Sequence, residues 1–231
     1  STYNNHVIVC GIGRVGFRVI EELLHLGCEV VAMDQDPNGR FAERVLSAGV
    51  PLIIGDARRQ ENLIKAGVEH AVAIIPCTND ELTNLDIALD ARELNPDIRV
   101  VMRMFDPDFA RRVEQGFGIQ TALSTSALAA PLFAAVATGL NSKHSFYVGD
   151  TLLHVHEIVI GPASKLLGWD VCRLETELNL SVVCHRRGAT ANLHPRPDTL
   201  LAAGDHVLVL ASLEILQRMH QLNGTKLHAQ S

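Results

Sequence analysis

The feature that most constrains the fold is a glycine turn, G-x-G-x-x-G, that directly follows the apolar residues 7–10. Gly11 permits a tight turn, Gly13 lets backbone N–H groups approach a pyrophosphate, and Gly16 lets a helix pack closely on its strand. The pattern predicts a strand followed by a helix whose positive end faces an anion. Other tight turns also use spaced glycines, so the surrounding residues decide between a phosphate site and a plain turn.

An acidic residue after the next apolar segment favours the phosphate site. Residues 14–26 have helical apolar spacing, and residues 29–33 predict a second strand that ends at Asp34. A carboxylate there accepts hydrogen bonds from both free hydroxyls of a ribose, whereas the 2′-phosphate of NADP would meet like charge. We therefore expect an adenine nucleotide other than NADP. The alternative for Asp34 is an exposed turn carboxylate.

Apolar segments and helical stretches keep alternating after Asp34, which favours βαβ units. Right-handed crossovers would wind them into an α/β, Rossmann-type doubly wound parallel sheet. The predicted strands are 51–54, 71–75, 98–105 and 122–124, and the predicted helices are 40–48, 60–66, 81–94, 109–117 and 127–138.

The alanine-rich helix 127–138 carries more apolar surface than one domain face requires. It either packs on its own sheet or acts as a crossover helix that is swapped or dimerises.

The pattern changes after a predicted linker at 139–143, because apolar residues then alternate with a period of two. We expect a nucleotide-binding domain over residues 1–141 and a smaller α+β domain over 142–231. The predicted strands of the second domain are 152–160, 181–185 and 206–211, its helices are 165–178 and 213–222, and residues 224–231 are expected to form a frayed tail.

Composition excludes several classes of partner. The 231 residues carry a formal charge of −6, which gives no basic footprint for nucleic acid or for an anionic membrane. No apolar run reaches the roughly 18 to 20 residues that span a bilayer, so no membrane insertion is expected in this chain. The five scattered cysteines indicate buried thiols in a reducing cytosol. Because the chain starts at Ser1 rather than methionine, we expect a fragment of a longer protein.

Ligands of a doubly wound sheet bind at the carboxyl ends of strands where the strand order reverses. Asp56 and nearby amides are placed to meet an adenine edge, and Thr78 and Asn79 to donate to ribose or phosphate. Asn79 and Asp80 are equally suited to cap a helix. The candidate loops hold Gly11, Ile12, Gly13, Arg14, Val15, Gly16, Asp34, Gln35, Gly55, Asp56, Ala57, Cys77, Thr78 and Asn79.

Two arginines are further candidates. Arg14 lies inside the glycine turn, where it either pairs with a phosphate beyond the first or is a solvated surface residue. Arg103 interrupts an apolar strand, and an unpaired buried charge there would cost several kcal/mol. It is either a phosphate or carboxylate clamp or one half of a salt bridge to a loop acid.

Metal and catalytic patterns are weak. Alternation places His154 and His156 on one strand face, but two ligands are too few for zinc. Four acids can offer oxygen ligands to Ca²⁺ or Mg²⁺, or can form a solvated helix face, which leaves metal binding unresolved. No serine–histidine–acid or cysteine–histidine arrangement can be assembled, so a nucleotide site without an evident reaction suggests sensing. The four acids are Asp80, Glu81, Asp86 and Asp90.

The order of motifs in both halves resembles the RCK, or TrkA-type, regulatory domains of prokaryotic potassium channels and transporters. In the first half the resemblance rests on residues 6–16, on Asp34 and on Gly55-Asp56-Ala57. In the second half it rests on Leu167-Gly168, Arg187-Gly188, residues 197–200 and Gly204-Asp205, so that it extends from about His6 to Leu222.

The resemblance implies a cytosolic regulator on the cytoplasmic side of the cell membrane, and not a catalyst. It implies that NAD(H) or ATP/ADP binds the first domain, and that the domains dimerise and assemble into a ring that opens or closes a potassium pore. Arg14 resembles the position that reaches the terminal phosphate in ATP-responsive members, and Gly16 would pack the helix. The implied ligand residues are Gly11, Ile12, Gly13, Arg14, Val15, Asp34, Cys77, Thr78 and Arg103.

Residues 124–126 depart from the family pattern, because Ser-Thr-Ser stands where relatives often carry a proline. The geometry before the crossover helix is therefore left open. Two rival functions also stay open. One is a nicotinamide-dependent oxidoreductase, although no acid–base group can be nominated for it. The other is the detached regulatory subunit of a potassium transporter.

Overall fold

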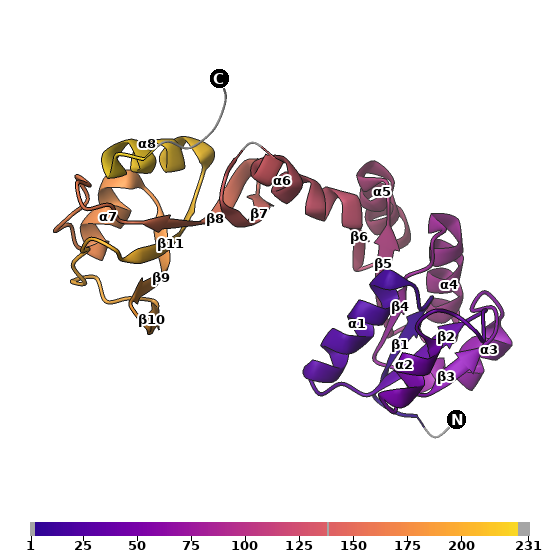
Figure 1. Cartoon of the computed structure of the whole chain (residues 1–231). Coiled ribbons are helices and arrows are strands. Elements are labelled where there is room, and N and C mark those ends of the chain that lie inside the picture. Colours follow the sequence, from indigo (N-terminus) through magenta and orange to yellow (C-terminus); the bar gives the residue numbers. More distant parts are fainter. Residues whose placement is uncertain (1–2, 138, 226–231) are drawn as a thin grey trace. The chain divides into compact units, whose positions relative to one another are not determined.

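A computed structural model of the chain describes residues 3–137 and 139–225 (Figure 1). By its contacts the chain divides into two compact units, Ser1–Ala127 and Leu128–Ser231. The sequence places the domain boundary later, after residue 141, and that boundary stays a prediction. Helix α6 (Thr125–Ala137) spans the division, and its buried Ala135 belongs to the core of the second unit.

The first unit is built on a six-stranded parallel sheet with the order β3-β2-β1-β4-β5-β6. This is the strand order of a Rossmann fold, and it reverses between β1 and β4. The predicted fold class is confirmed. The strands are β1 (Val7–Cys10), β2 (Val30–Asp34), β3 (Leu52–Ile54), β4 (Ala73–Pro76), β5 (Arg99–Met104) and β6 (Thr121–Ser124).

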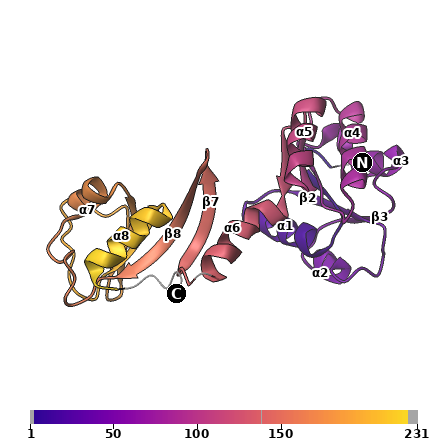
Figure 2. The ribbon, with the colours of Figure 1, turned by 90° about the horizontal axis from the view of Figure 1, so that it is seen from above.

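Helices cover both faces of this sheet, with α1 and α2 on one side and α4 and α5 on the other (Figure 2). Side chains alternate between the two faces along each strand. In β1, Val7 and Val9 therefore pack with Phe17 of α1, whereas Ile8 and Cys10 join the core that contains α4. The helices are α1 (Arg14–His25), α2 (Ala42–Ser47), α3 (Gln60–Lys65), η1 (Val68–His70), α4 (Glu81–Leu94) and α5 (Pro107–Phe117).

The second unit is an antiparallel sheet of order β10-β9-β11-β8-β7 with α7 and α8. The predicted smaller α+β domain is confirmed as a class. Of the frayed tail expected at 224–231, residues 226–231 lie outside the described part of the chain. The elements are β7 (Ser142–Val148), β8 (Thr151–Val159), α7 (Val171–Leu178), β9 (Ser181–Arg187), β10 (Thr190–Leu193), β11 (His206–Ala211) and α8 (Leu213–Asn223).

Several predicted boundaries are wrong for local reasons. The predicted linker at 139–143 ends inside β7, which begins at Ser142. The helix expected from residue 165 begins only at Val171, because Gly168 has a left-handed φ of +77° and Asp170 caps the helix by accepting from Arg173 N at 2.7 Å. Helix α5 begins two residues early, where Asp106 caps it and Pro107 opens it.

Ser124 and Ser126 resolve the segment before the crossover helix. Both hydroxyls donate to the carbonyl oxygen of Phe105, at 2.8 Å and 3.0 Å, and Ala127 N donates to Ser124 Oγ at 3.3 Å. The serines thereby fix the passage from β6 into α6 without a proline. Among the described residues, no helix of this fold combines the length and apolarity needed to cross a bilayer.

Two histidines of β8 lie on its buried face, as the alternation predicts. His156 Nε2 lies 2.8 Å from His220 Nε2 of α8, and His154 Nδ1 lies 2.9 Å from Ser145 Oγ. Burial, with the nearby imidazole of His220, lowers the pKa of His156 from 6.5 to about 4, and burial also lowers the pKa of His154 and of His220. The pair is therefore held neutral and hydrogen-bonded.

This arrangement predicts that the second unit loses stability in mild acid. Each folded-state pKa lies below the unfolded value, so below pH 6.5 the folded chain binds fewer protons than the unfolded chain. Acid therefore favours the unfolded state. His156 alone should cost about 1.4 kcal/mol for each pH unit in this range. Thermal denaturation between pH 7.5 and pH 4.5 should show a smaller acid-dependent loss for His156→Leu than for the native chain. His144→Leu, at an exposed position of β7, should leave the loss unchanged; equal pH profiles for both variants would contradict this account.

Candidate functional site

A cleft of about 850 Å³ lies at the carboxyl ends of the central strands of the first unit. Its position is the switch point between β1 and β4, where ligands of doubly wound sheets bind. It is lined by Gly11, Ile12, Gly13, Arg14, Val15, Met33, Asp34, Gln35, Asp36, Gly39, Arg40, Phe41, Gly55, Ala57, Arg58, Cys77, Thr78, Asn79, Asp80, Thr83, Ile87 and Arg103.

The three glycines of the turn have different steric roles. Gly11 has a φ of +88°, and a Cβ there would lie 2.9 Å from Thr78 N, so this position needs glycine twice over. A Cβ on Gly16 would lie 2.0 Å from the carbonyl oxygen of Gly11. By contrast, a Cβ on Gly13 would meet no atom within 4 Å. Gly11 and Gly16 therefore build the turn, whereas Gly13 leaves space above it.

The amino end of α1 is prepared for an anion. The first N–H groups of any helix lack an acceptor within the helix. In α1 no capping side chain accepts from them, and its first turn holds no acidic residue. The neighbouring helices differ, because Asp80 caps α4 by accepting from Leu82 N at 2.8 Å, and Asp106 caps α5 by accepting from Asp108 N at 2.8 Å. The capping role for Asp80 is confirmed. A phosphate at α1 would supply the missing acceptor.

Asp34 ends β2 at the edge of the cleft, as predicted. Its Oδ2 accepts from Ile12 N at 2.6 Å, and its Oδ1 accepts from Asp36 N at 3.0 Å. The carboxylate thus links the glycine turn to the β2 loop. Each carboxylate oxygen has a further lone pair, so both can still accept a ribose hydroxyl.

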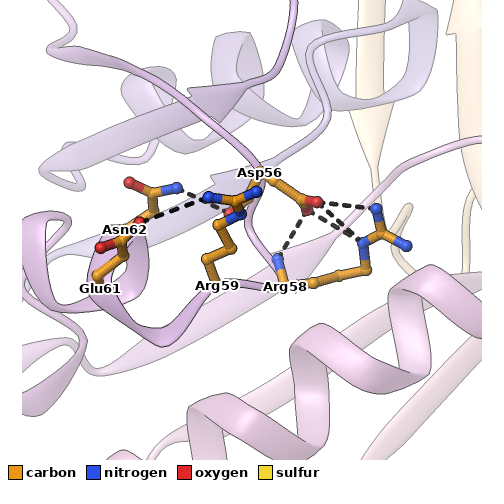
Figure 3. A network of polar contacts seen from close by, with 5 residues as sticks. All are labelled: Asp56, Arg58, Arg59, Glu61 and Asn62. Atoms are coloured by element: carbon orange, nitrogen blue, oxygen red, sulfur yellow. Dashed lines mark hydrogen bonds and ion pairs between the residues drawn. The ribbon is translucent and has the colours of Figure 1, made fainter.

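Asp56 is the predicted site residue that the structure directs elsewhere. Its carboxylate faces Arg58, whose Nη2 donates to Oδ2 at 2.8 Å, and it does not line the cleft (Figure 3). The hydrogen bond from the Arg58 side chain lowers the pKa of Asp56. Ala57 and Arg58 line the cleft in its place. Gly16 also lies outside the lining, which agrees with its role in helix packing.

Arg103 reaches the cleft from the end of β5 without meeting an acid. Its Nη1 donates to Asn79 Oδ1 at 3.2 Å, and its guanidinium carbon lies 4.5 Å from the centre of the Phe105 ring. Its Nε is buried and has no hydrogen-bond partner. The alternative of a salt bridge to a loop acid is not observed within the described residues. An unpaired guanidinium with an unused N–H suits an anionic ligand.

Of the loop that follows β2, only Gln35 was predicted as a site residue. Arg40 and Phe41 line the cleft, and Phe41 stacks on Phe17 with 4.7 Å between ring centres. Arg44 lies over Phe17 at 4.2 Å, which fixes this aromatic pair. The position of residues 35–41 directly after the ribose-site acid was the available signal. Arg14 and Arg40 both line the cleft, and within the described residues neither forms an ion pair. Their positive charges are therefore not neutralised by an acid of the chain.

Groups suited to catalysis or to metal binding are scarce here. Among the residues that the structure describes, no histidine lines the cleft. Burial raises the pKa of Cys77 to about 11, which keeps its thiol protonated. Burial also raises the pKa of Cys10, beneath the turn. Among the described residues no group of three or more His, Cys, Asp or Glu side chains is placed to hold a metal ion. The cleft offers binding groups and little acid–base chemistry.

Comparison with known families agrees with this geometry. The family model of the TrkA-N domain matches residues 7–125, and that of the TrkA-C domain matches residues 155–224. The chain belongs to the TrkA-N domain family, and its second unit matches the TrkA-C domain. The first match contains the whole Rossmann-type sheet and its cleft, and the second contains most of the antiparallel sheet. The resemblance found in the sequence is thereby confirmed.

Several relatives of this TrkA-type chain are named as potassium transport proteins. It is 26% identical over 224 residues to potassium channel protein 1 of Methanocaldococcus jannaschii, covering 94% of this chain and 66% of that protein. It is 29% identical over 205 residues to the Trk system potassium uptake protein TrkA of Streptomyces coelicolor, covering 89% of both. The chain thus spans slightly less than two thirds of the archaeal channel protein.

Solved structures show the same fold. The GsuK channel bound to NAD matches with a TM-score of 0.60 and 14% identity over 98% of this chain and 40% of that one. The TrkA-N domain of the Escherichia coli inner membrane protein ybaL matches with a TM-score of 0.53 and 24% identity, covering 59% of this chain and 98% of that one.

The glycine geometry predicts that one substitution in the TrkA-N domain mainly lowers its stability and that another mainly weakens nucleotide binding. Gly16→Ala places a methyl group against Gly11 O and should destabilise the domain by about 1–3 kcal/mol. Gly13→Ala meets open space, but alanine is a poorer N-cap than glycine, so it should cost at most about 1 kcal/mol, while its methyl group obstructs the phosphate path. Thermal denaturation and nucleotide calorimetry separate the effects. A stable Gly16→Ala, or a Gly13→Ala with native nucleotide affinity, would contradict the assignment.

Proposed function

We propose that this chain is a nucleotide-sensing regulatory module of a potassium channel, and that an adenine nucleotide, NAD(H) or ATP/ADP, binds the cleft of the TrkA-N domain. The observation that carries the proposal is the convergence of an uncapped helix end, unpaired arginines and the Asp34 carboxylate at one strand-order switch point. Phosphates need the first two groups and a ribose needs the third.

Each group has a defined task in this proposal. The N–H groups at the start of α1 and the open space over Gly13 hold the pyrophosphate, and Asp34 accepts from the ribose. Arg103 and Arg14 meet charge beyond the first phosphate, since neither is ion-paired within the described residues. These residues fit the ligand because an orphaned Arg103 N–H and an uncapped helix both lack an acceptor. When bound, the nucleotide supplies phosphate charge and hydroxyl donors, and no redox step is required.

The names of the relatives support potassium transport as the process. They include an archaeal potassium channel protein and a Trk uptake protein, and the GsuK channel structure is described as bound to NAD. We infer a module on the cytoplasmic side of the cell membrane that acts on a potassium pore. The match to 89% of the Streptomyces TrkA keeps a detached transporter subunit as the second candidate.

An oxidoreductase is less well supported. Hydride transfer to or from a substrate needs an acid–base group beside the nicotinamide. The described cleft lining holds no histidine, and its only thiol, Cys77, has a raised pKa. Turnover of a metabolite with NADH at ordinary enzymatic rates would reverse this preference.

Regulation requires that the nucleotide distinguish two arrangements of the assembly. A ligand shifts an equilibrium only by the difference in its affinity for the two states. Saturating nucleotide that left the open probability of the intact channel unchanged would therefore disprove gating by this ligand, even if binding were tight.

An uncovered apolar face supports assembly of two copies. On the α1 side of the sheet, Leu123 of β6 is 42% exposed and Val101 of β5 is only half-buried. Leu26, the C-cap residue of the neighbouring helix α1, is 77% exposed. The outward residues of α6 are also apolar, with Phe133 75% exposed and Leu128 61% exposed. We infer that α6 of a second copy covers this face, and that dimers are the unit of a larger ring.

The nucleotide site is tested by calorimetry with NADH, NAD, ATP, ADP and AMP. Asp34→Ala removes charged acceptors, each worth about 1.5–3 kcal/mol, so every ribose-bearing ligand should bind at least about tenfold more weakly. Asp90→Ala, a carboxylate on α4 outside the cleft lining, should leave the affinities unchanged. Thermal unfolding without ligand measures the separate cost of losing the Ile12 N–H acceptor. Native affinities in Asp34→Ala would place the site elsewhere.

The dimer is tested by Phe133→Glu. A charge at this exposed position should leave the fold intact but oppose burial against a partner, so sedimentation equilibrium should show a shift from dimer to monomer. Leu193→Glu is the matched control, because Leu193 is 72% exposed on β10. An identical mass for Phe133→Glu and the native chain would rule out α6 as the interface.

A further inference from the structure

Asn84 is a fully buried amide beside the cleft that contributes nothing to the lining itself. It lies in α4 with 0% of its surface exposed. Its Oδ1 accepts from Thr78 N at 2.9 Å and from Thr78 Oγ1 at 2.7 Å. Its Nδ2 donates to Thr78 O at 3.3 Å and to Arg103 O at 2.9 Å. Both donors and both acceptor sites of the amide are therefore used.

These bonds connect the parts of the site that come from different elements. Thr78 follows β4 and lies against the glycine turn, since a Cβ on Gly11 would lie 2.9 Å from its N atom. Arg103 ends β5 and carries the unpaired guanidinium. Asn84 attaches both backbones to α4. A buried amide with four partners restrains its neighbours strongly, because any rotation would leave a polar group unsatisfied.

The bonds also set the polarity of Thr78 towards a ligand. Its N–H is taken by Asn84 Oδ1, and its hydroxyl hydrogen is directed to Asn84 Oδ1 at 2.7 Å or to Asp80 O at 3.1 Å. Its carbonyl oxygen accepts from Asn84 Nδ2 and from Arg103 Nη1, and its hydroxyl oxygen accepts from Asp80 N at 3.3 Å. With both donors directed into the protein, Thr78 offers one lone pair of its hydroxyl oxygen and a methyl group to the cleft. Thr78 was expected from the sequence to donate to ribose or phosphate. Its hydrogen bonds suit the opposite role, that of an acceptor for a ligand hydroxyl or amide.

We propose that Asn84 is a positioning residue of the nucleotide site, which holds Thr78 as a hydrogen-bond acceptor and keeps the end of β5 in place so that Arg103 reaches the cleft. This inference rests on the proposed function, because it assigns a role in binding the nucleotide. Asn84 acts through Thr78 and Arg103 and does not itself touch the ligand. In this arrangement an uncharged part of the nucleotide that carries a hydrogen-bond donor binds at Thr78, and an anionic part binds at Arg103.

The chain offers a matched control on the same helix. Asn95 follows α4 at its other end, and its Nδ2 donates to Val68 O at 2.8 Å and to Ala71 O at 3.1 Å. It makes the same kind of side-chain to backbone bonds as Asn84, but it does not line the cleft or contact the residues that do so. Asn84→Leu and Asn95→Leu should both lower the thermal midpoint, so a loss of binding specific to Asn84→Leu cannot be attributed to stability.

The experiment measures affinities for ADP and NADH by calorimetry in the full chain, and amide hydrogen exchange without ligand. We expect Asn84→Leu to bind both probes at least tenfold more weakly and to expose the Thr78 amide to exchange. Asn95→Leu should bind them as the native chain does. Asn84→Asp keeps both acceptors for Thr78 but cannot donate to the carbonyl oxygen of Arg103. It should therefore retain protection of the Thr78 amide and regain part of the affinity, and it serves if Asn84→Leu fails to fold.

A double-mutant cycle tests whether Asn84 acts through Thr78. Thr78→Val removes the hydroxyl at nearly constant volume and should weaken both probes severalfold in the native background, but little further in the Asn84→Leu background. Additive losses, or native affinities in both Asn84 variants, would overturn the positioning role while leaving the nucleotide site intact. Failure of the native chain to bind either probe would instead overturn the proposed function, and this inference with it.

Discussion

The site depends on a close backbone contact between the glycine turn and the loop after β4. Gly11 meets Thr78 at a distance that no side chain permits, and Gly16 meets Gly11 in the same way. These contacts bring the start of α1, the end of β2 and the end of β4 to one point, where the strand order reverses. The cleft exists because three carboxyl strand ends converge there, and because Asp34 and Asn84 accept hydrogen bonds from the backbone N–H groups of Ile12 and Thr78 and so hold the loops together.

Electrostatics then decides what the cleft accepts. Most acids near it are already engaged, with Asp80 and Asp106 at helix caps and Asp56 on Arg58. Arg58 is the partner of Asp56, but within the described residues Arg14, Arg40 and Arg103 form no ion pair, and Arg103 donates to neutral oxygens and lies over the Phe105 ring. A surplus of unpaired positive groups next to an uncapped helix costs free energy without a ligand, since each donor lacks a strong acceptor. An anion relieves this cost, which is a physical reason for a nucleotide to stabilise the domain.

The sequence predicted the first unit well because its rules are local. A glycine turn after an apolar strand, an acid at the next strand end and alternating helices determine the sheet order, and these follow from backbone sterics and periodicity. What escaped prediction depends on tertiary contacts. Asp56 pairs with Arg58, and Arg40 and Phe41 lie at the cleft. These positions depend on side-chain contacts that form only in the folded chain. The bonds between Thr78 and Asn84 escaped prediction for the same reason, since Asn84 lies in α4 and Thr78 in the loop before it.

The second unit was harder to predict because its strands pair with distant segments. Only three of its strands had clear alternation, whereas β7 and β10 are edge strands with largely exposed side chains and a weak apolar pattern. Its buried polar groups are equally nonlocal: Asp205 accepts from Arg187 and from His185, and His156 faces His220. Burial alone would raise the pKa of Asp205, but these donors lower it well below its usual range. Each of these bonds joins residues that are at least 18 positions apart in the sequence, so local periodicity could not have revealed them, whereas the folded unit depends on them to pair its buried polar groups.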